Sequence, residues 1–309
     1  YIIMPEICEV VLTAQYLLSK LKGRHITNIE ILSGKYKHKK LEGIDLIEMY
    51  SPLEVINIDT KGKFMWFELK NKDTFVYILN SFGLTGEWSF FKSQSDRIVF
   101  TISNNDKDNN TYKLYYSDQR NMGNIKITTD KNILDEKLNK LAPDLLKSTY
   151  TNQDFVEWTK KFIMASPRRK NMLIVKVLLN QNIDDGIGSG IGNYLVAEIL
   201  YRARISPCRS IGSLSDEELL TLAQTIKKVL KMCYMSNKTG YMKKLSDFVD
   251  IHKVKVKEGK FPNYLPEIPD DEEFSFMVYR KKKDIFENPV CNSKLVNGRS
   301  TYWVPNIQK

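Results

Sequence analysis

The spacing of hydrophobic residues changes along the chain, and the first stretch has the spacing of a helix. Between residues 5 and 22, apolar side chains recur at every third or fourth position, as they do on the buried face of an amphipathic helix. Pro5 suits the first helical turn, and Gly23 suits the position just after the last one. We therefore predict a helix over residues 5–22.

The helical period is lost from about residue 24 to residue 130. Short runs of β-branched and aromatic residues alternate there with turn-forming residues. The runs are VINIDT, KFMWFEL, TFVYIL, RIVFTIS and YKLYYSD. Runs of this length and composition are typical of antiparallel strands. This half of the chain is therefore predicted to be mostly β-structure.

The second half returns to the helical period and ends in strand-like sequence. Segments such as NMLIVKVLLNQ and NYLVAEILYRARI have apolar residues at helical spacing. The tail contains FSFMVYRKKKD and STYWV, which favour strands. The order of elements predicts an α+β chain in four parts: a β domain at 1–135, a linker at 136–149, a helical domain at 150–272 with a surface loop at its end, and a hairpin at 273–309.

Charge favours an anionic partner. Lysine and arginine total 47 against 37 acidic residues, so the net charge is +10. A basic balance of this size is typical of proteins that bind nucleic acid, although a composition rich in lysine and asparagine also produces it without such binding.

Several other classes of protein are disfavoured. No apolar run reaches the length of a membrane span, and the first residues lack the features of a secretory signal. The four cysteines are scattered and no histidine lies near one, so neither a disulfide framework nor a zinc site is expected. We expect an intracellular protein, in the nucleus or the cytoplasm, with no metal, cofactor or membrane partner.

The segment GIGNYLVAEILYRARISP, residues 190–207, is the strongest local signal for chemistry. Its glycines would let the backbone approach a phosphate, the helix that follows would present its first N–H groups to that anion, and Asn193 would add a side-chain donor. Gly186–Ser189 is an alternative turn of the same kind. We favour Gly190–Asn193, because the helical sequence follows it without a gap.

This segment resembles the helix–two-turn–helix of the formamidopyrimidine-DNA glycosylase/endonuclease VIII family. Further blocks occur in the family's order: Met4-Pro5-Glu6, Thr60–Lys63, Phe82-Gly83-Leu84-Thr85-Gly86, Asp118–Gly123, LAPDLL, and a final hairpin of VYRKKKD with GRSTYW. The details look closest to giant-virus endonuclease VIII-like proteins. The resemblance implies an N-terminal antiparallel β-sandwich with an N-terminal helix, a helical helix–two-turn–helix domain, and a β-hairpin finger.

In this family the nitrogen of an N-terminal proline is the nucleophile, which here is Pro5. A free α-amino group titrates near pH 8, so part of it is unprotonated at neutral pH. Because an acylated nitrogen would be inert, we expect residues 1–3 to belong to an upstream reading frame and Met4 to be the start. The resemblance makes Glu6 the general acid and Glu9 a further active-site carboxylate, whereas helix N-terminal acids are the plain alternative.

The resemblance also assigns DNA contacts. The family's phosphate ligands match Lys63, Asn193 and Arg299, and Lys63 also belongs to the catalytic set. Contacts of this kind help to rotate a nucleotide out of the stack. Leu84, Arg120 and Met122 match the residues that fill the resulting void. As an alternative, Leu84 and Met122 would simply be buried between hairpins.

The finger departs from the zinc-bearing members of the family. By alignment, the positions of their four cysteines fall near Phe286, Pro289, Val304 and Ile307. The resemblance therefore implies a zincless finger, which we expect to dock on the helical domain through apolar residues that include Phe276 and Tyr302.

The function implied is that of a bifunctional DNA glycosylase/AP lyase of base excision repair. Such an enzyme removes oxidised pyrimidines and hydantoins from damaged double-stranded DNA and cuts the strand by β,δ-elimination. We expect it to work as a monomer in the nucleus, the cytoplasm or a viral factory. Two alternatives stay open: a catalytically silent damage-binding protein that keeps residues 1–3, and a generic basic nucleic-acid module.

Overall fold

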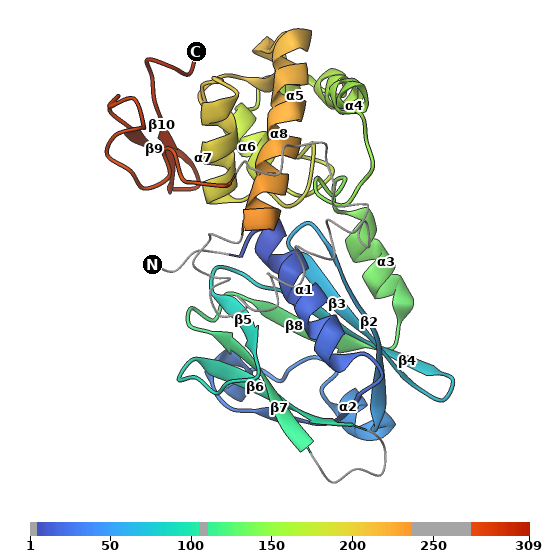
Figure 1. Ribbon diagram of the computed structural model, residues 1–309. Coiled ribbons are helices and arrows are strands. Elements are labelled where there is room, and N and C mark those ends of the chain that lie inside the picture. The colour runs from blue at the N-terminus through green and yellow to red at the C-terminus, as the bar shows by residue number, and fades with distance from the viewer. Residues whose placement is uncertain (1–4, 105–110, 237–272) are drawn as a thin grey trace. The chain divides into compact units, whose positions relative to one another are not determined.

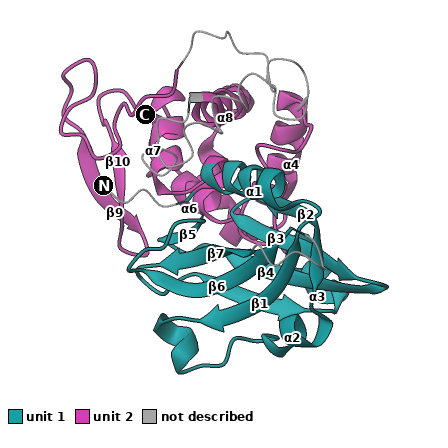
Figure 2. Ribbon diagram, turned by 60° about the horizontal axis from the view of Figure 1, so that its bottom comes forward, with its two compact units in different colours: residues 1–5, 9–139 teal, residues 6–8, 140–309 magenta. Residues whose placement is uncertain are grey.

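The computed structural model describes residues 5–104, 111–236 and 273–309. Contacts divide the chain into two compact units, which Figure 2 distinguishes by colour. Unit 1 comprises residues 1–5 and 9–139, and unit 2 comprises residues 6–8 and 140–309. The boundary after residue 139 falls inside the predicted linker, and most of the predicted surface loop lies outside the described residues. The finer domain limits stay predictions.

The predicted N-terminal helix is present as α1, Ile7–Leu21 (Figure 1). Four residues of its apolar stripe join the hydrophobic core of unit 1: Val10, Ala14, Leu17 and Leu21. Gly23 follows the helix with a φ of +75°, a backbone conformation that glycine adopts without strain. The spacing of apolar residues therefore located this helix correctly.

Unit 1 is built on one antiparallel sheet of eight strands. The strands are β1 (His25–Ile31), β2 (Leu53–Lys61), β3 (Phe64–Asn71), β4 (Thr74–Ser81), β5 (Gly86–Ser89), β6 (Asp96–Ser103), β7 (Thr111–Asp118) and β8 (Asn124–Thr128). Their order is β5-β7-β6-β1-β2-β3-β4-β8. β1 and β2 pair only at His25–Glu54 and Ile26–Leu53, so the two halves of the sheet are joined at a narrow corner.

The two halves of the sheet form a sandwich around one core, as the resemblance implies. Buried residues of all eight strands belong to this core. Trp88 of β5 lies near its centre, with ring centroids 5.0 Å from Phe67 of β3, 5.5 Å from Phe100 of β6 and 5.1 Å from Tyr116 of β7. Rings from both halves of the sheet thus meet at the side chain of Trp88.

Three short helical elements complete unit 1. They are the 3₁₀ helix η1 (Gly34–Lys37), α2 (Asp45–Tyr50) and α3 (Lys131–Asn139). The segment from η1 to α2 runs beside β8, which is an edge strand of the sheet. Ile127 of β8 donates its backbone N–H to the carbonyl of Glu42 at 2.9 Å. Covering an edge in this way removes unpaired backbone groups.

Unit 2 is helical, as predicted from residue 150 onward. Its elements are α4 (Asn152–Met164), α5 (Pro167–Lys170), α6 (Ile174–Leu179), α7 (Asn193–Arg202), η2 (Ile211–Ser213), α8 (Asp216–Ser236), β9 (Cys291–Val296) and β10 (Arg299–Trp303). α7 is buried along almost its whole length, which agrees with its near-continuous apolar sequence. The β9–β10 hairpin lies beside α7 (Figure 1).

One expectation for the finger is wrong. FSFMVYRKKKD, residues 274–284, forms turns rather than a strand, and β10 pairs instead with β9. The cause is tertiary: the buried carboxylate of Glu198 on α7 accepts the backbone N–H groups of Met277, Val278 and Tyr279 at 2.9–3.1 Å. These N–H groups are therefore unavailable to a neighbouring strand.

Candidate nucleic-acid interface

Glu6 is the predicted site residue with the most defined surroundings. Its carboxylate accepts backbone N–H bonds from Gly192 at 2.7 Å, Tyr194 at 2.8 Å and Leu195 at 3.2 Å. Gly192 is the N-cap residue of α7, and Tyr194 and Leu195 lie in the first turn of that helix. As a glycine, Gly192 has no side chain that could cap the helix. Glu6 therefore supplies the acceptors that the helix N-terminus needs, and its negative charge suits the positive end of the helix.

This arrangement corrects one expectation about the Gly190–Asn193 turn. The N–H groups at the start of α7 were expected to face a DNA phosphate, but the carboxylate of Glu6 occupies three of them. The close approach also explains a glycine: a Cβ on Gly192 would lie 2.3 Å from Cδ of Glu6. Any phosphate contact at this turn must therefore come from other groups, of which the side chain of Asn193 is the first candidate.

The choice between the two glycine turns is settled as far as the helix is concerned. α7 begins at Asn193, directly after Gly192. The alternative turn packs elsewhere, because Ser189 donates its backbone N–H to Pro143 at 2.8 Å and a Cβ on Gly188 would meet Leu145 at 2.4 Å. The second turn leads into the helix, as expected, and the first rests on the LAPDLL segment.

Asn193 and Arg299 lie close together in unit 2. The side-chain Nδ2 of Asn193 donates to the carbonyl of Ser300 at 2.9 Å, and Ser300 follows Arg299 in β10. Arg299 is exposed and follows the two-residue turn Asn297–Gly298, both residues of which have positive φ. This is the geometry of a tight hairpin turn, and it holds the arginine at the hairpin tip.

The predicted void-filling residues occupy two adjacent loops in unit 1. Leu84 lies in loop 82–85 between β4 and β5, and Arg120 and Met122 lie in loop 119–123 between β7 and β8. Arg120 is exposed, Met122 is 54% exposed and Leu84 is half-buried. Burial between hairpins, the plain alternative for Met122, is therefore wrong.

Polar contacts hold these two loops together. Thr85 donates its hydroxyl to Oδ1 of Asp118 at 2.5 Å and accepts the backbone N–H of Arg120 at 2.9 Å. Oδ2 of Asp118 accepts the N–H of Gly123 at 2.7 Å. Asp118 is 1% exposed, and its bond to Gly123 is buried. Sequence reasoning gave Thr85 and Asp118 no role of their own, although both belong to quoted family blocks.

The other predicted site residues lie in or next to helices and strands of unit 1. Pro5 lies two residues before Ile7, the first residue of α1, and Glu9 lies buried in the first turn of that helix. Lys63 lies in the turn between β2 and β3. The predicted start at Met4 falls in residues 1–4, outside the described residues. Whether these residues act together with Glu6, Asn193 and Arg299 stays a prediction, because the latter belong to unit 2.

The finger is closed by polar side chains in the region where zinc-bearing relatives have cysteines. Asp284 accepts bonds from the hydroxyl of Tyr201 at 2.9 Å and from the backbone N–H of Asn288 at 2.8 Å. Gln308 accepts the N–H of Val304 at 2.7 Å and donates to the carbonyl of Ile205 at 2.9 Å. In the described part of the chain, no group of three or more His, Cys, Asp or Glu side chains could hold a metal ion.

Apolar docking of the finger agrees with expectation. Tyr194 of α7 has ring centroids 5.6 Å from Phe276 and 6.1 Å from Tyr279, and Tyr279 lies 5.3 Å from Tyr302 of β10. Burial raises the pKa of Tyr279, the charge of Arg280 lowers it, and that of Glu6 raises it.

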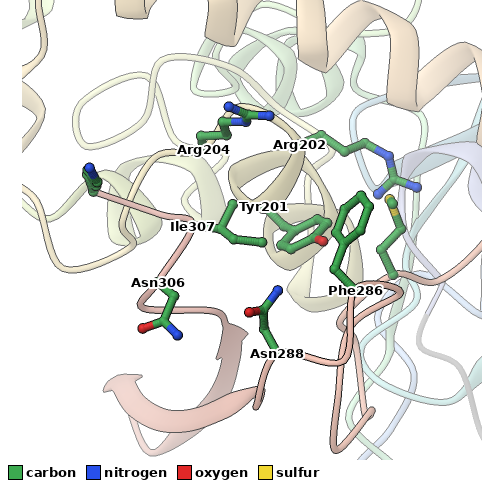
Figure 3. Close-up of a pocket in the computed structure, with 9 residues that line it drawn as sticks. Tyr201, Arg202, Arg204, Phe286, Asn288, Asn306 and Ile307 are labelled. Atoms are coloured by element: carbon green, nitrogen blue, oxygen red, sulfur yellow. The ribbon is translucent and has the colours of Figure 1, made fainter.

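A pocket of about 570 Å³ lies at the other end of α7 (Figure 3). Its lining includes Tyr201, Arg202, Arg204, Phe286, Asn306 and Lys309. It contains none of the predicted site residues and is lined by residues at the C-terminal end of α7, whereas Asn193 begins that helix. The pocket is therefore separate from the candidate interface.

Comparison with models of protein families shows to which family the chain belongs. Three models of one protein match the chain in order: the formamidopyrimidine-DNA glycosylase N-terminal domain at residues 4–125, its H2TH domain at 141–244, and its C-terminal domain at 266–309. The chain belongs to the formamidopyrimidine-DNA glycosylase family. The family's domain order accounts for both units and the finger.

Curated relatives in this family match the chain over its full length. Formamidopyrimidine-DNA glycosylase of Pelotomaculum thermopropionicum is 26% identical over 99% of each chain. The enzyme of Rickettsia bellii is 25% identical over 99% of this chain and 100% of its own. The special likeness to giant-virus proteins stays a prediction.

Solved structures of the glycosylase family share the fold. MutM (Fpg) of Thermus thermophilus matches with a TM-score of 0.70 and 21% identity over 98% of each chain. Lactococcus lactis formamidopyrimidine-DNA glycosylase, bound non-covalently to DNA containing an AP site, matches with a TM-score of 0.71 and 20% identity over 98% of this chain and 99% of its own. The predicted α+β fold is confirmed. No helix among the described residues is long and apolar enough to cross a membrane.

Proposed function

We propose that this protein is a bifunctional DNA glycosylase/AP lyase that removes oxidised bases from duplex DNA with the nitrogen of Pro5 as nucleophile. The observation that carries the proposal is the capping of α7 by Glu6. Because Glu6 is fixed, the backbone directly after Pro5 is fixed as well. This is the preorganisation that an attacking group at a chain terminus requires.

The first step is attack of the Pro5 amine on C1′ of the damaged nucleotide, with departure of the base. The ammonium formed loses its proton to Glu6, which returns that proton to the sugar ring oxygen as the ring opens to an iminium ion. Glu6 accepts three N–H bonds, which hold its carboxylate next to Pro5 in the sequence, and a carboxylate in this position can take up a proton and return it. We thus assign Glu6 a role as acceptor before it acts as donor.

Elimination then breaks the strand. Loss of a proton from C2′ of the iminium expels the 3′ phosphate, a second elimination expels the 5′ phosphate, and hydrolysis of the iminium regenerates the amine. Lys63, Asn193 and Arg299 are assigned to the DNA phosphates, and Leu84, Arg120 and Met122 to the gap left by the extruded nucleotide. Glu9 is assigned to the same active site.

Oxidised pyrimidines and hydantoins are the proposed substrates. One Lactococcus lactis structure of this fold contains DNA with an oxidised pyrimidine, and another contains DNA with Fapy-dG, so the fold accommodates both base classes. A panel of duplexes with one lesion each, assayed by single-turnover strand cleavage, separates the two preferences. Faster cleavage of Fapy-containing duplex would contradict the assignment to pyrimidines.

Borohydride trapping tests the nucleophile. A chain that begins at Pro5 should form a covalent adduct with abasic DNA when the iminium is reduced, and a chain that retains residues 1–3 should not, because its Pro5 nitrogen is an amide. The catalytically silent alternative, in which residues 1–3 stay attached, predicts that protein from its native source binds damaged DNA without forming an adduct. Equal trapping in both chains would exclude the Pro5 nitrogen as nucleophile.

A further inference from the structure

A run of basic residues follows β1 and contains none of the predicted site residues. Residues 35–40 read KYKHKK, and we call them the basic segment. The side chains from Lys37 to Lys40 are exposed. A charge run of this kind is often only a solvated surface, so its surroundings decide whether it has a function.

The start of the basic segment is bonded to loop 119–123. Nζ of Lys35 donates to the carbonyl of Gly123 and to Oδ1 of Asn124, the latter at 2.6 Å. Arg97 bonds to a residue next to the loop and to one near the basic segment: its Nε donates to the carbonyl of Asp118 at 2.7 Å, and its guanidinium also donates to the hydroxyl of Ser33 at 2.7 Å. The basic segment and the loop of Arg120 and Met122 thus form one connected part of unit 1.

The basic segment is also anchored along β8. The hydroxyl of Tyr36 accepts the backbone N–H of Ile125 at 2.7 Å, and the carbonyl of Glu42, just after the segment, accepts that of Ile127 at 2.9 Å. Leu41 is buried. Because Tyr36 and Glu42 are both bonded to β8, the residues between them, which include Lys37–Lys40, are held as a short arch beside this edge strand.

Acidic side chains neutralise only part of the lysine charge on this arch. Lys40 pairs with Asp45 at 2.5 Å, whereas Lys37 and Lys39 form no ion pair with any residue that the structure describes. Burial lowers the pKa of Lys35, Asp118 raises it, and the charge of Lys39 lowers it again. Two exposed cations, Lys37 and Lys39, thus lie on one short segment, and Lys39 is close enough to Lys35 to affect its pKa. An anionic partner would stabilise this arrangement.

We propose that Lys37 and Lys39 bind backbone phosphates of duplex DNA beside the point where loop 119–123 inserts. This inference rests on the proposed function and extends its DNA surface. Duplex is favoured because a residue that fills a void acts on stacked base pairs, and contacts beside it hold the stack against the loop. A single strand offers no such stack.

Equilibrium binding to a duplex with a tetrahydrofuran abasic analogue tests the proposal without turnover. Each phosphate contact contributes a slope of about 0.9 in log K against log salt. The variant Lys37→Ala/Lys39→Ala should therefore reduce the slope by about two and weaken binding roughly 60-fold near 0.1 M salt. Binding of the same sequence as a single strand should change far less.

A matched pair of lysines controls for general charge. Lys20 and Lys22 are exposed and precede β1, whereas the basic segment follows it, so the two pairs are about 20 Å apart along this strand. Lys20→Ala/Lys22→Ala should leave the slope unchanged. An unchanged slope for Lys37→Ala/Lys39→Ala, or an equal loss in the control, would overturn the proposal.

Failure of this inference is distinguishable from failure of the proposed function. Borohydride trapping on single-stranded abasic DNA reports the nucleophile, and the basic-segment variant should trap as the parent chain does. The salt slope is measured without chemistry, so it tests Lys37 and Lys39 whether or not Pro5 reacts.

Discussion

Asp118 provides the most direct test of how the two loops are held. Its buried carboxylate makes two hydrogen bonds, to Thr85 and Gly123. Asp118→Asn keeps the size of the side chain but leaves one acceptor oxygen. One bond to a charged acceptor, about 1.5–3 kcal/mol, is lost, and the other becomes a neutral bond that is weaker by roughly 1 kcal/mol. We expect a cost of about 2.5–4 kcal/mol.

This cost should reduce activity on duplex DNA selectively. A penalty of ~2.5 kcal/mol, the lower end of this range, shifts a loop equilibrium about 60-fold, since 1.4 kcal/mol is tenfold. We expect single-turnover excision from a lesion-containing duplex to fall by about that factor or more, because the loops carry the residues proposed to fill the void. Strand cleavage at an abasic site in a single strand, which leaves no void in a stack, should fall little.

Asp96→Asn is the matched control. Asp96 is also a buried carboxylate of unit 1, and it accepts bonds from Ser93 and Ser117 rather than from either loop. It should lower the unfolding midpoint in urea without changing the ratio of duplex to single-strand activity. An equal change of that ratio in both variants would refute the assignment of Asp118 to loop positioning.

Three further outcomes are expected. Gly192→Ala should displace Glu6, destabilise the chain by about 1–3 kcal/mol in urea unfolding and abolish trapping; normal trapping would show that the cap is dispensable. The Arg209 hydrogen bonds hold the pKa of Glu218 below its ordinary value, so the pair stabilises the fold above that ordinary value and loses this effect as the pH falls through the folded pKa. Carboxyl NMR titration measures it, and an Arg209→Gln variant with an unchanged Glu218 pKa would contradict the cause. Gln308→Leu should lower Tm, because two buried backbone groups lose their partner; an unchanged Tm would mean that water replaces it.

Periodic segments could be predicted from the sequence, because their pattern is local. The stripe of α1 and the apolar run of α7 gave helices at the correct places. The longer strands, such as β3 and β6, were marked by β-branched and aromatic runs. Short strands with mixed composition, such as β5 and β8, were not marked individually, because pairing with neighbours rather than propensity defines them.

The errors and omissions arise from long-range contacts. Residues 274–284 have strand composition, but the carboxylate of Glu198 takes their N–H groups. The cap that Glu6 provides joins residues 186 positions apart. The basic segment gained meaning only from its bonds to loop 119–123. No spacing rule along the chain reports such partners.

The cap that Glu6 provides on α7 has a consequence for relatives that lose activity during evolution. Under the proposed mechanism, a descendant that no longer cut DNA could replace Pro5 freely, whereas loss of Glu6 would still leave the N–H groups at the start of α7 without their acceptors. Retention of Glu6 in distant relatives would thus report the fold rather than catalysis, and under the proposed mechanism only retention of Pro5 would report an active enzyme.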